Sequence, residues 1–62
     1  MEKILEYQES EFVGVRVEKD LSICQYVVSI KLGKYGDYTE RARFALACDL
    51  IKFLNDRLER TA

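Results

Sequence analysis

The chain has 62 residues, a formal net charge of −1, 48% hydrophobic residues, two cysteines and no histidine. A chain this short forms a single domain, residues 1–62, and buries only about 60% of the surface that its unfolded form exposes. The hydrophobic content, with few glycines and no proline, is typical of a folded domain. We find no signal peptide and no apolar run near the roughly 20 residues of a membrane span. We therefore expect a cytoplasmic protein with no membrane contact and with reduced cysteines.

The composition argues against an enzyme. Histidine, the commonest general base and metal ligand, is missing, and the sequence has no Gly-rich phosphate loop, no activated Ser or Cys and no paired carboxylates. The sequence therefore predicts no catalytic residue, no metal site, no cofactor and no small-molecule substrate.

The first half of the chain has the alternation of strands. Residues 1–10 are ambiguous, since their apolar side chains suit either a short strand or one helical turn. Residues 12–18 and 23–32 alternate in polarity and are rich in β-branched and aromatic side chains. This pattern predicts two antiparallel strands joined by a turn at 19–22.

The second half predicts a long helix. Gly33 and Gly36 mark a turn, after which residues 34–38 form a short third strand. Thr39 is then a natural helix N-cap, and residues 40–60 contain no Gly or Pro. The predicted fold is α+β: a small antiparallel sheet of two or three strands packed on one long C-terminal helix.

Two apolar stripes run along the predicted helix, and together they cover more than half of its circumference. The first stripe and the apolar strand faces form the predicted core, in which both cysteines act as small apolar residues. The members of that core are Val15, Val17, Tyr26, Val28, Ile30, Phe44, Ala47, Cys48, Ile51 and Leu54.

The second stripe consists of Leu46, Leu50 and Phe53. One face of a small sheet cannot cover both stripes, so either the N-terminal segment or a partner chain must cover this one. We predict that these three residues form an interface in a homodimer or with a protein partner.

Short motifs stand in a fixed order through the middle of the chain. They are FVGVR at 12–16, YVVSI at 26–30, GK at 33–34, YGDY at 35–38 and ALACD at 45–49. In this order and spacing they resemble the AP2-type DNA-binding domain of plant transcription factors and of phage and bacterial mobile-element proteins. The resemblance covers Phe12 to about Asn55.

Members of that family lay the exposed face of their sheet in the major groove of DNA, with the helix packed behind. The resemblance therefore implies a small DNA-binding or accessory protein of mobile-element type, with duplex DNA as its partner. Arg16 would fork onto guanine or phosphate, and Gln25 would read adenine. The DNA-binding residues implied in this way are Arg16, Gln25, Ser29, Lys31 and Lys34.

The charge balance favours an alternative. A dedicated nucleic-acid-binding protein usually has a basic excess, because neutralising phosphates supplies much of its affinity. The acidic start of the chain, the neutral sheet face and the second apolar stripe suit a protein-interaction module, such as a phage or plasmid regulator or inhibitor. The sequence leaves both hypotheses open.

Overall fold

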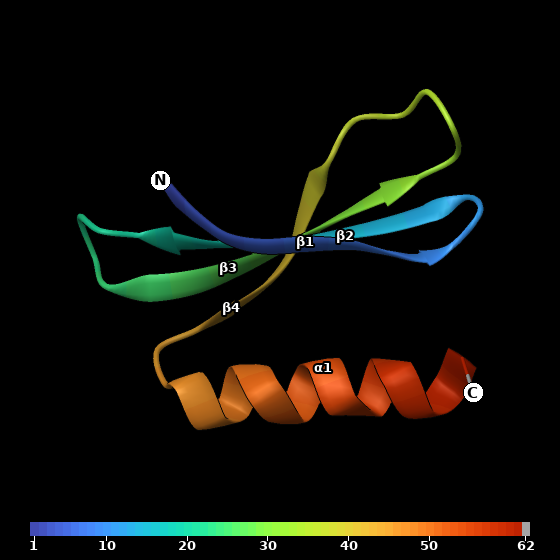
Figure 1. Cartoon of the computed structure of the whole chain (residues 1–62). Helices are drawn as coiled ribbons and strands as arrows, with labels where there is room; N and C mark the ends of the chain where they lie inside the picture. The colour runs from blue at the N-terminus through green and yellow to red at the C-terminus, as the bar shows by residue number, and fades with distance from the viewer. Residues whose placement is uncertain (62) are drawn as a thin grey trace.

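In the computed structural model, which describes residues 1–61, four antiparallel strands precede one helix (Figure 1). The strands are β1 (Glu2–Ser10), β2 (Val13–Asp20), β3 (Gln25–Leu32) and β4 (Thr39–Phe44), and the helix is α1 (Ala47–Thr61). Each strand pairs with the next along the chain, so β1 and β4 are the edges of the sheet. α1 covers one face of the sheet and leaves the other open (Figure 1). The predicted α+β architecture is confirmed, with four strands in place of two or three.

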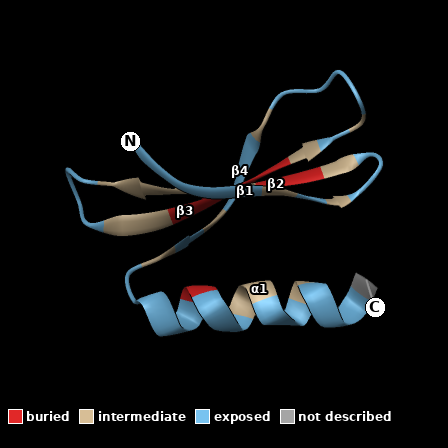
Figure 2. Ribbon diagram, viewed as in Figure 1, coloured by how far each residue is buried: buried red, intermediate tan, exposed pale blue. Residues whose placement is uncertain are grey.

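The central pair of strands forms as the alternation predicts. Val15 pairs with Ile30 and Val17 pairs with Val28, so these four side chains point to the same face, toward α1. Val15, Val17 and Val28 have no exposed surface. Buried residues gather in the middle of the sheet and at one turn of α1 (Figure 2).

Two residues with a positive φ angle shape the connections after β2 and β3. Cys24, with φ of 52°, ends the β2–β3 turn, where the carboxylate of Asp20 accepts hydrogen bonds from the N–H and the hydroxyl of Ser22 at 3.1 and 2.6 Å. Gly33, with φ of 86°, donates its N–H to the carbonyl of Phe12 at 2.7 Å. This bond joins the end of β3 to the β1–β2 turn.

The ambiguous segment 1–10 is a strand, and its irregular pairing explains the ambiguity. The register of β1 against β2 shifts between Lys3 and Leu5 and again between Gln8 and Ser10. Each shift breaks the period of two by which a strand is recognised in a sequence.

The predicted start of the helix was wrong. Thr39 is not a helix cap but the first residue of β4, and α1 begins only at Ala47. Residues 34–38, predicted as a third strand, form the β3–β4 connection. Pairing with β3 holds Thr39–Phe44 in a strand, although Glu, Arg and Ala in this segment favour a helix.

The predicted helix phase was also wrong. Leu50 is 7% exposed and lies in the core, whereas Ile51 is 56% and Leu46 is 59% exposed. Similar exposure of Ile51 and Leu46 excludes a buried stripe through Ile51. Phe53, assigned to the uncovered stripe, packs against the core instead.

The other predicted core residues are partly confirmed. Ile30 is buried as predicted, and Tyr26, Phe44 and Leu54 are partly buried against the core cluster. The prediction that both cysteines lie in the core was wrong. Cys24 lies in a turn and Cys48 in the first turn of α1, and both are free and exposed. Ala47, at the start of α1, is exposed as well.

Two contacts fix α1 on the sheet. The rings of Phe44 and Phe53 lie 5.3 Å apart at an angle of 48°. Farther along the helix, Arg57 forks onto the carboxylate of Glu9 in β1, with N–O distances of 2.6 and 2.7 Å. This bond raises the pKa of Arg57, and the Glu9 side chain is only 4% exposed.

α1, the one helix within residues 1–61, is neither long nor apolar enough to cross a membrane.

Candidate nucleic-acid interface

The open face of the sheet, away from α1, carries mostly polar side chains, with one buried apolar residue, Val27 (1% exposed), among them. Residues paired across neighbouring strands point to the same face, so the register defines rows of side chains. The three central rows are Gln8, Gly14 and Lys31; Glu6, Arg16, Ser29 and Glu40; and Lys3, Glu18, Val27 and Arg43.

Tyr38, just before β4, packs on the first two of these rows. Its ring centroid is 4.0 Å from the guanidinium carbon of Arg16 and 5.5 Å from the ammonium nitrogen of Lys31. A Cβ on Gly14 would lie 2.8 Å from the Tyr38 hydroxyl oxygen, so a glycine is needed for this close approach. Burial, followed by the carboxylate of Glu6, raises the pKa of Tyr38. The result is an aromatic ring in contact with two cations on the open face of the sheet.

Arg16 is also tied to the edge strand. Its Nε donates to the Glu6 carboxylate at 2.8 Å, and both side chains remain about one third exposed. This hydrogen bond holds the pKa of Glu6 below its usual range. Part of the positive charge of Arg16 is therefore already balanced.

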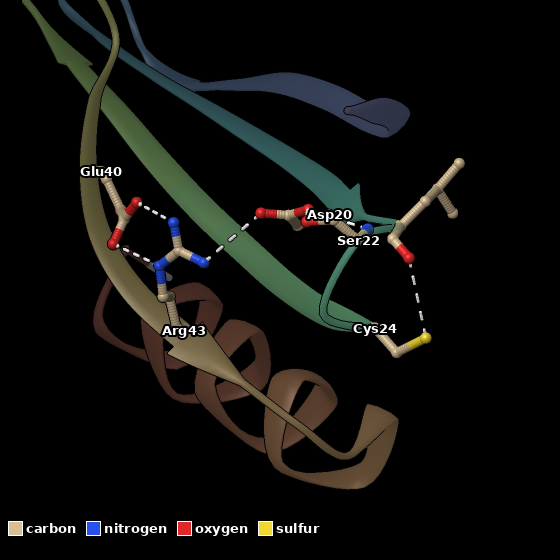
Figure 3. Close-up of polar contacts among 6 residues, drawn as sticks. Asp20, Ser22, Cys24, Glu40 and Arg43 are labelled. Atoms are coloured by element: carbon tan, nitrogen blue, oxygen red, sulfur yellow. Dashed lines mark hydrogen bonds and ion pairs between the residues drawn. The ribbon is translucent and has the colours of Figure 1, made fainter.

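A second group of ion pairs surrounds Arg43 (Figure 3). Arg43 forks onto the carboxylate of Glu40, three residues earlier in β4, at 2.8 and 2.9 Å. Its guanidinium also lies 3.8 Å from the carboxylate of Asp20 at the end of β2. The pKa of Glu40 is lowered mainly by Arg43, and that of Asp20 mainly by the Ser22 hydroxyl. Arg16 and Arg43, the arginines of the open face, are thus both paired with carboxylates.

The β3–β4 connection rises from the side of the sheet opposite α1 (Figure 1). Tyr35 in this connection is 94% exposed, and Lys34 beside it is exposed. Between the connection and the β1–β2 turn lies a polar hollow of about 360 Å³. It is lined by Gln8, Ser10, Glu11, Lys31, Gly33 and Lys34.

The structure brings the predicted DNA-binding residues to one side of the molecule. Arg16, Gln25, Ser29 and Lys31 point to the open face by their register, and Lys34 lies in the raised connection. Ser29 is only 8% exposed, so its hydroxyl is poorly placed to meet a ligand.

Sequence reasoning missed Tyr38 and Gly14 as a unit. Both stood in the quoted motifs, but their contact joins residues that are 24 positions apart. No local pattern carries such a contact.

The predicted interface residues do not form one surface. Leu46 is exposed in the short link before α1, Leu50 is buried against the sheet, and Phe53 packs on Phe44. An interface that includes Leu50 would require α1 to leave the sheet.

Comparison of the chain with protein-family models, curated proteins and solved structures found no match. The resemblance to AP2-type domains therefore rests on the motifs alone. β4 occupies the segment in which the resemblance implies the start of the helix.

Proposed function

We propose that this protein binds single-stranded nucleic acid on the open face of its sheet. The observation that carries the proposal is the Tyr38 ring, which packs on Gly14 and contacts both Arg16 and Lys31. Proteins that bind single strands combine aromatic side chains, on which bases stack, with cations that follow the phosphates. Tyr35, exposed in the adjoining connection, provides a second ring.

The charge balance favours a single strand over a duplex. Affinity for a duplex depends strongly on neutralised phosphates, and this chain has a net charge of −1 with Arg16 and Arg43 paired to carboxylates. Stacking contributes about 1–3 kcal/mol per base in addition to the phosphate contacts. Lys31 and Lys34, which form no ion pair within residues 1–61, remain for phosphate contacts. The duplex implied by the AP2-type resemblance is the competing ligand.

Fluorescence anisotropy with labelled oligonucleotides, single-stranded and duplex, over about 50–200 mM salt tests the proposal. We expect the single strand to bind more tightly than the duplex of the same sequence at every salt concentration. Tyr38→Leu should weaken single-strand binding by about 5–150-fold, the equivalent of one stacked base. Ile23→Ala, in the exposed β2–β3 turn, is the matched control and should leave it unchanged.

Two results would contradict the proposal. Equal or tighter binding of the duplex would assign duplex recognition to the open face. No binding of either form at the lowest salt, where electrostatic attraction is least screened, would remove nucleic acid as the ligand.

The protein-interaction hypothesis is supported by a different surface. An apolar groove of about 300 Å³ runs between β1 and α1, on the side of the sheet opposite the open face. A protein that recognised this chain through the groove would leave Tyr38 untouched.

A further inference from the structure

The groove between β1 and α1 is an apolar recess of about 300 Å³. Leu5, Ile51 and Leu58 on its walls are 38%, 56% and 50% exposed. Its full lining is Leu5, Tyr7, Ile51, Leu54, Asn55 and Leu58. Apolar side chains gathered in one recess mark an interaction surface more often than single exposed ones do.

The helix side of this groove is self-complementary. Ile51, Asn55 and Leu58 follow a spacing of four and three residues and lie along one side of α1. If two copies of α1 meet antiparallel with Asn55 opposite Asn55, Ile51 of each copy faces Leu58 of the other. The Asn55 carboxamide both donates and accepts hydrogen bonds, so it can pair with its own symmetry mate. A polar residue at such a position fixes the register of paired helices.

The charges beside this stripe match in the same register. Lys52 stands three residues before Asn55 and Glu59 stands four residues after it, on the same flank of α1. The antiparallel arrangement places Lys52 of one copy beside Glu59 of the other, and a twofold axis repeats the pair. Neither residue forms an ion pair within the part of the chain that the structure describes.

We propose that two copies of this chain pair through α1, antiparallel about a twofold axis at Asn55, so that Ile51 and Leu58 of each copy cover the groove of the other. A specific interface buries about 800 Å² per partner, about a fifth of the 4428 Å² surface of the chain. A groove lined by six residues is small by that measure, so the dimer dissociates in the micromolar range. The open face and Tyr38 remain free in this dimer.

Sedimentation velocity from about 1 to 500 µM, without nucleic acid, tests the dimer. We expect a monomer at the lowest concentrations and a dimer at the highest. Ile51→Glu should raise the dissociation constant at least tenfold, because it places a carboxylate against Leu58 of the other copy in an apolar contact. Ile23→Glu changes an equally exposed isoleucine outside the groove and should leave the constant unchanged. Circular dichroism of both variants verifies that the fold is retained.

The flanking charges test the register. Lys52→Glu alone and Glu59→Lys alone should each weaken the dimer, because each places like charges together. The double swap should restore the wild-type dissociation constant. A chain that stays monomeric over the whole range, or a dimer indifferent to Ile51→Glu, would overturn the proposal. Failure of the double swap to restore association would overturn the antiparallel register.

Discussion

The two faces of the sheet are built from alternate residues of the same strands, but their side chains make different contacts. On the covered face, valines of β2 and β3 pack under α1, and the Glu9–Arg57 pair closes one side. On the open face, arginines meet carboxylates at the surface and Tyr38 packs on Gly14. The covered face therefore supplies stability through burial, and the open face presents groups that remain available to a ligand.

This difference predicts that neighbouring residues will separate stability from binding. A change on the covered face should lower the free energy of unfolding, whereas a change on the open face should alter binding and leave stability nearly unchanged.

Leu50 and Ile51 give the sharpest contrast within the helix. Leu50→Ala should lower the free energy of unfolding by about 2–5 kcal/mol, because it opens a cavity in the core. Ile51→Ala should cost less than about 1 kcal/mol, because Ile51 is 56% exposed. Urea denaturation at a concentration that favours the monomer measures both. Equal costs for the two changes would show that the phase of α1 is wrong.

Loss of the Glu9–Arg57 pair should have the second largest effect on the free energy of unfolding. Arg57→Gln should cost about 1–3 kcal/mol, because it leaves the Glu9 carboxylate, with a side chain only 4% exposed, without its forked partner. Arg60→Gln, an exposed arginine in the last turn of the same helix, should change stability by less than about 0.5 kcal/mol. The same denaturation experiment compares them. A negligible effect of Arg57→Gln would mean that β1 is held to α1 by apolar contacts alone.

Two glycines should separate binding from stability. Gly14→Ala should displace the Tyr38 hydroxyl and the Gln8 amide, both at the ends of long side chains. It should therefore cost less than about 1 kcal/mol of stability but weaken single-strand binding as much as Tyr38→Leu does. Gly33→Ala meets no neighbouring atom, but its φ of 86° should cost about 1–2 kcal/mol of stability and spare Tyr38. Anisotropy and denaturation of both variants test the pair, and a Gly14→Ala protein that binds normally would contradict the role of Tyr38.

Lowering the pH should have the smallest effect on the stability of the fold. Hydrogen bonds from Arg16, Ser22 and Arg43 hold the pKa values of Glu6, Asp20 and Glu40 below their usual range in the folded chain. A carboxylate with a depressed pKa stabilises the fold above its unfolded pKa, and this stabilisation is lost as the pH falls through the folded pKa. The urea midpoint should therefore be constant above about pH 5 and decline below it. The Glu6→Gln/Glu40→Gln double variant should decline less, and an identical decline would contradict these pairs.

Sequence patterns predicted the centre of the sheet and failed at its edges. β2 and β3 pair in regular register, so their alternation could be read directly. β1 and β4 each contain an irregularity that breaks the period of two. In β4 the residues also prefer a helix, and only the neighbouring strand decides otherwise.

The helix phase failed for a related reason. A helix that begins at residue 40 adds Phe44 to the apolar stripe of Ile51, but Phe44 belongs to β4 and not to α1.

The candidate site could be predicted only in part. The period of two placed Arg16, Gln25 and Lys31 on one face, and the structure keeps them there. The partners of Arg16 could not be predicted, because Glu6 reaches it through the pairing of β1, which the sequence left ambiguous. The carboxylate of Glu6 balances part of the charge of Arg16 beside the Tyr38 ring.

The most direct test of the central claim is a titration of the ¹⁵N-labelled protein with a short single-stranded oligonucleotide, followed by two-dimensional NMR. Binding on the open face should shift the amide signals of Gly14, Arg16, Lys31 and Tyr38 most strongly. The signals of Ile51, in the groove behind the sheet, should change little. Saturating shifts centred on the groove, or no shifts at all, would contradict a nucleic-acid interface on the open face.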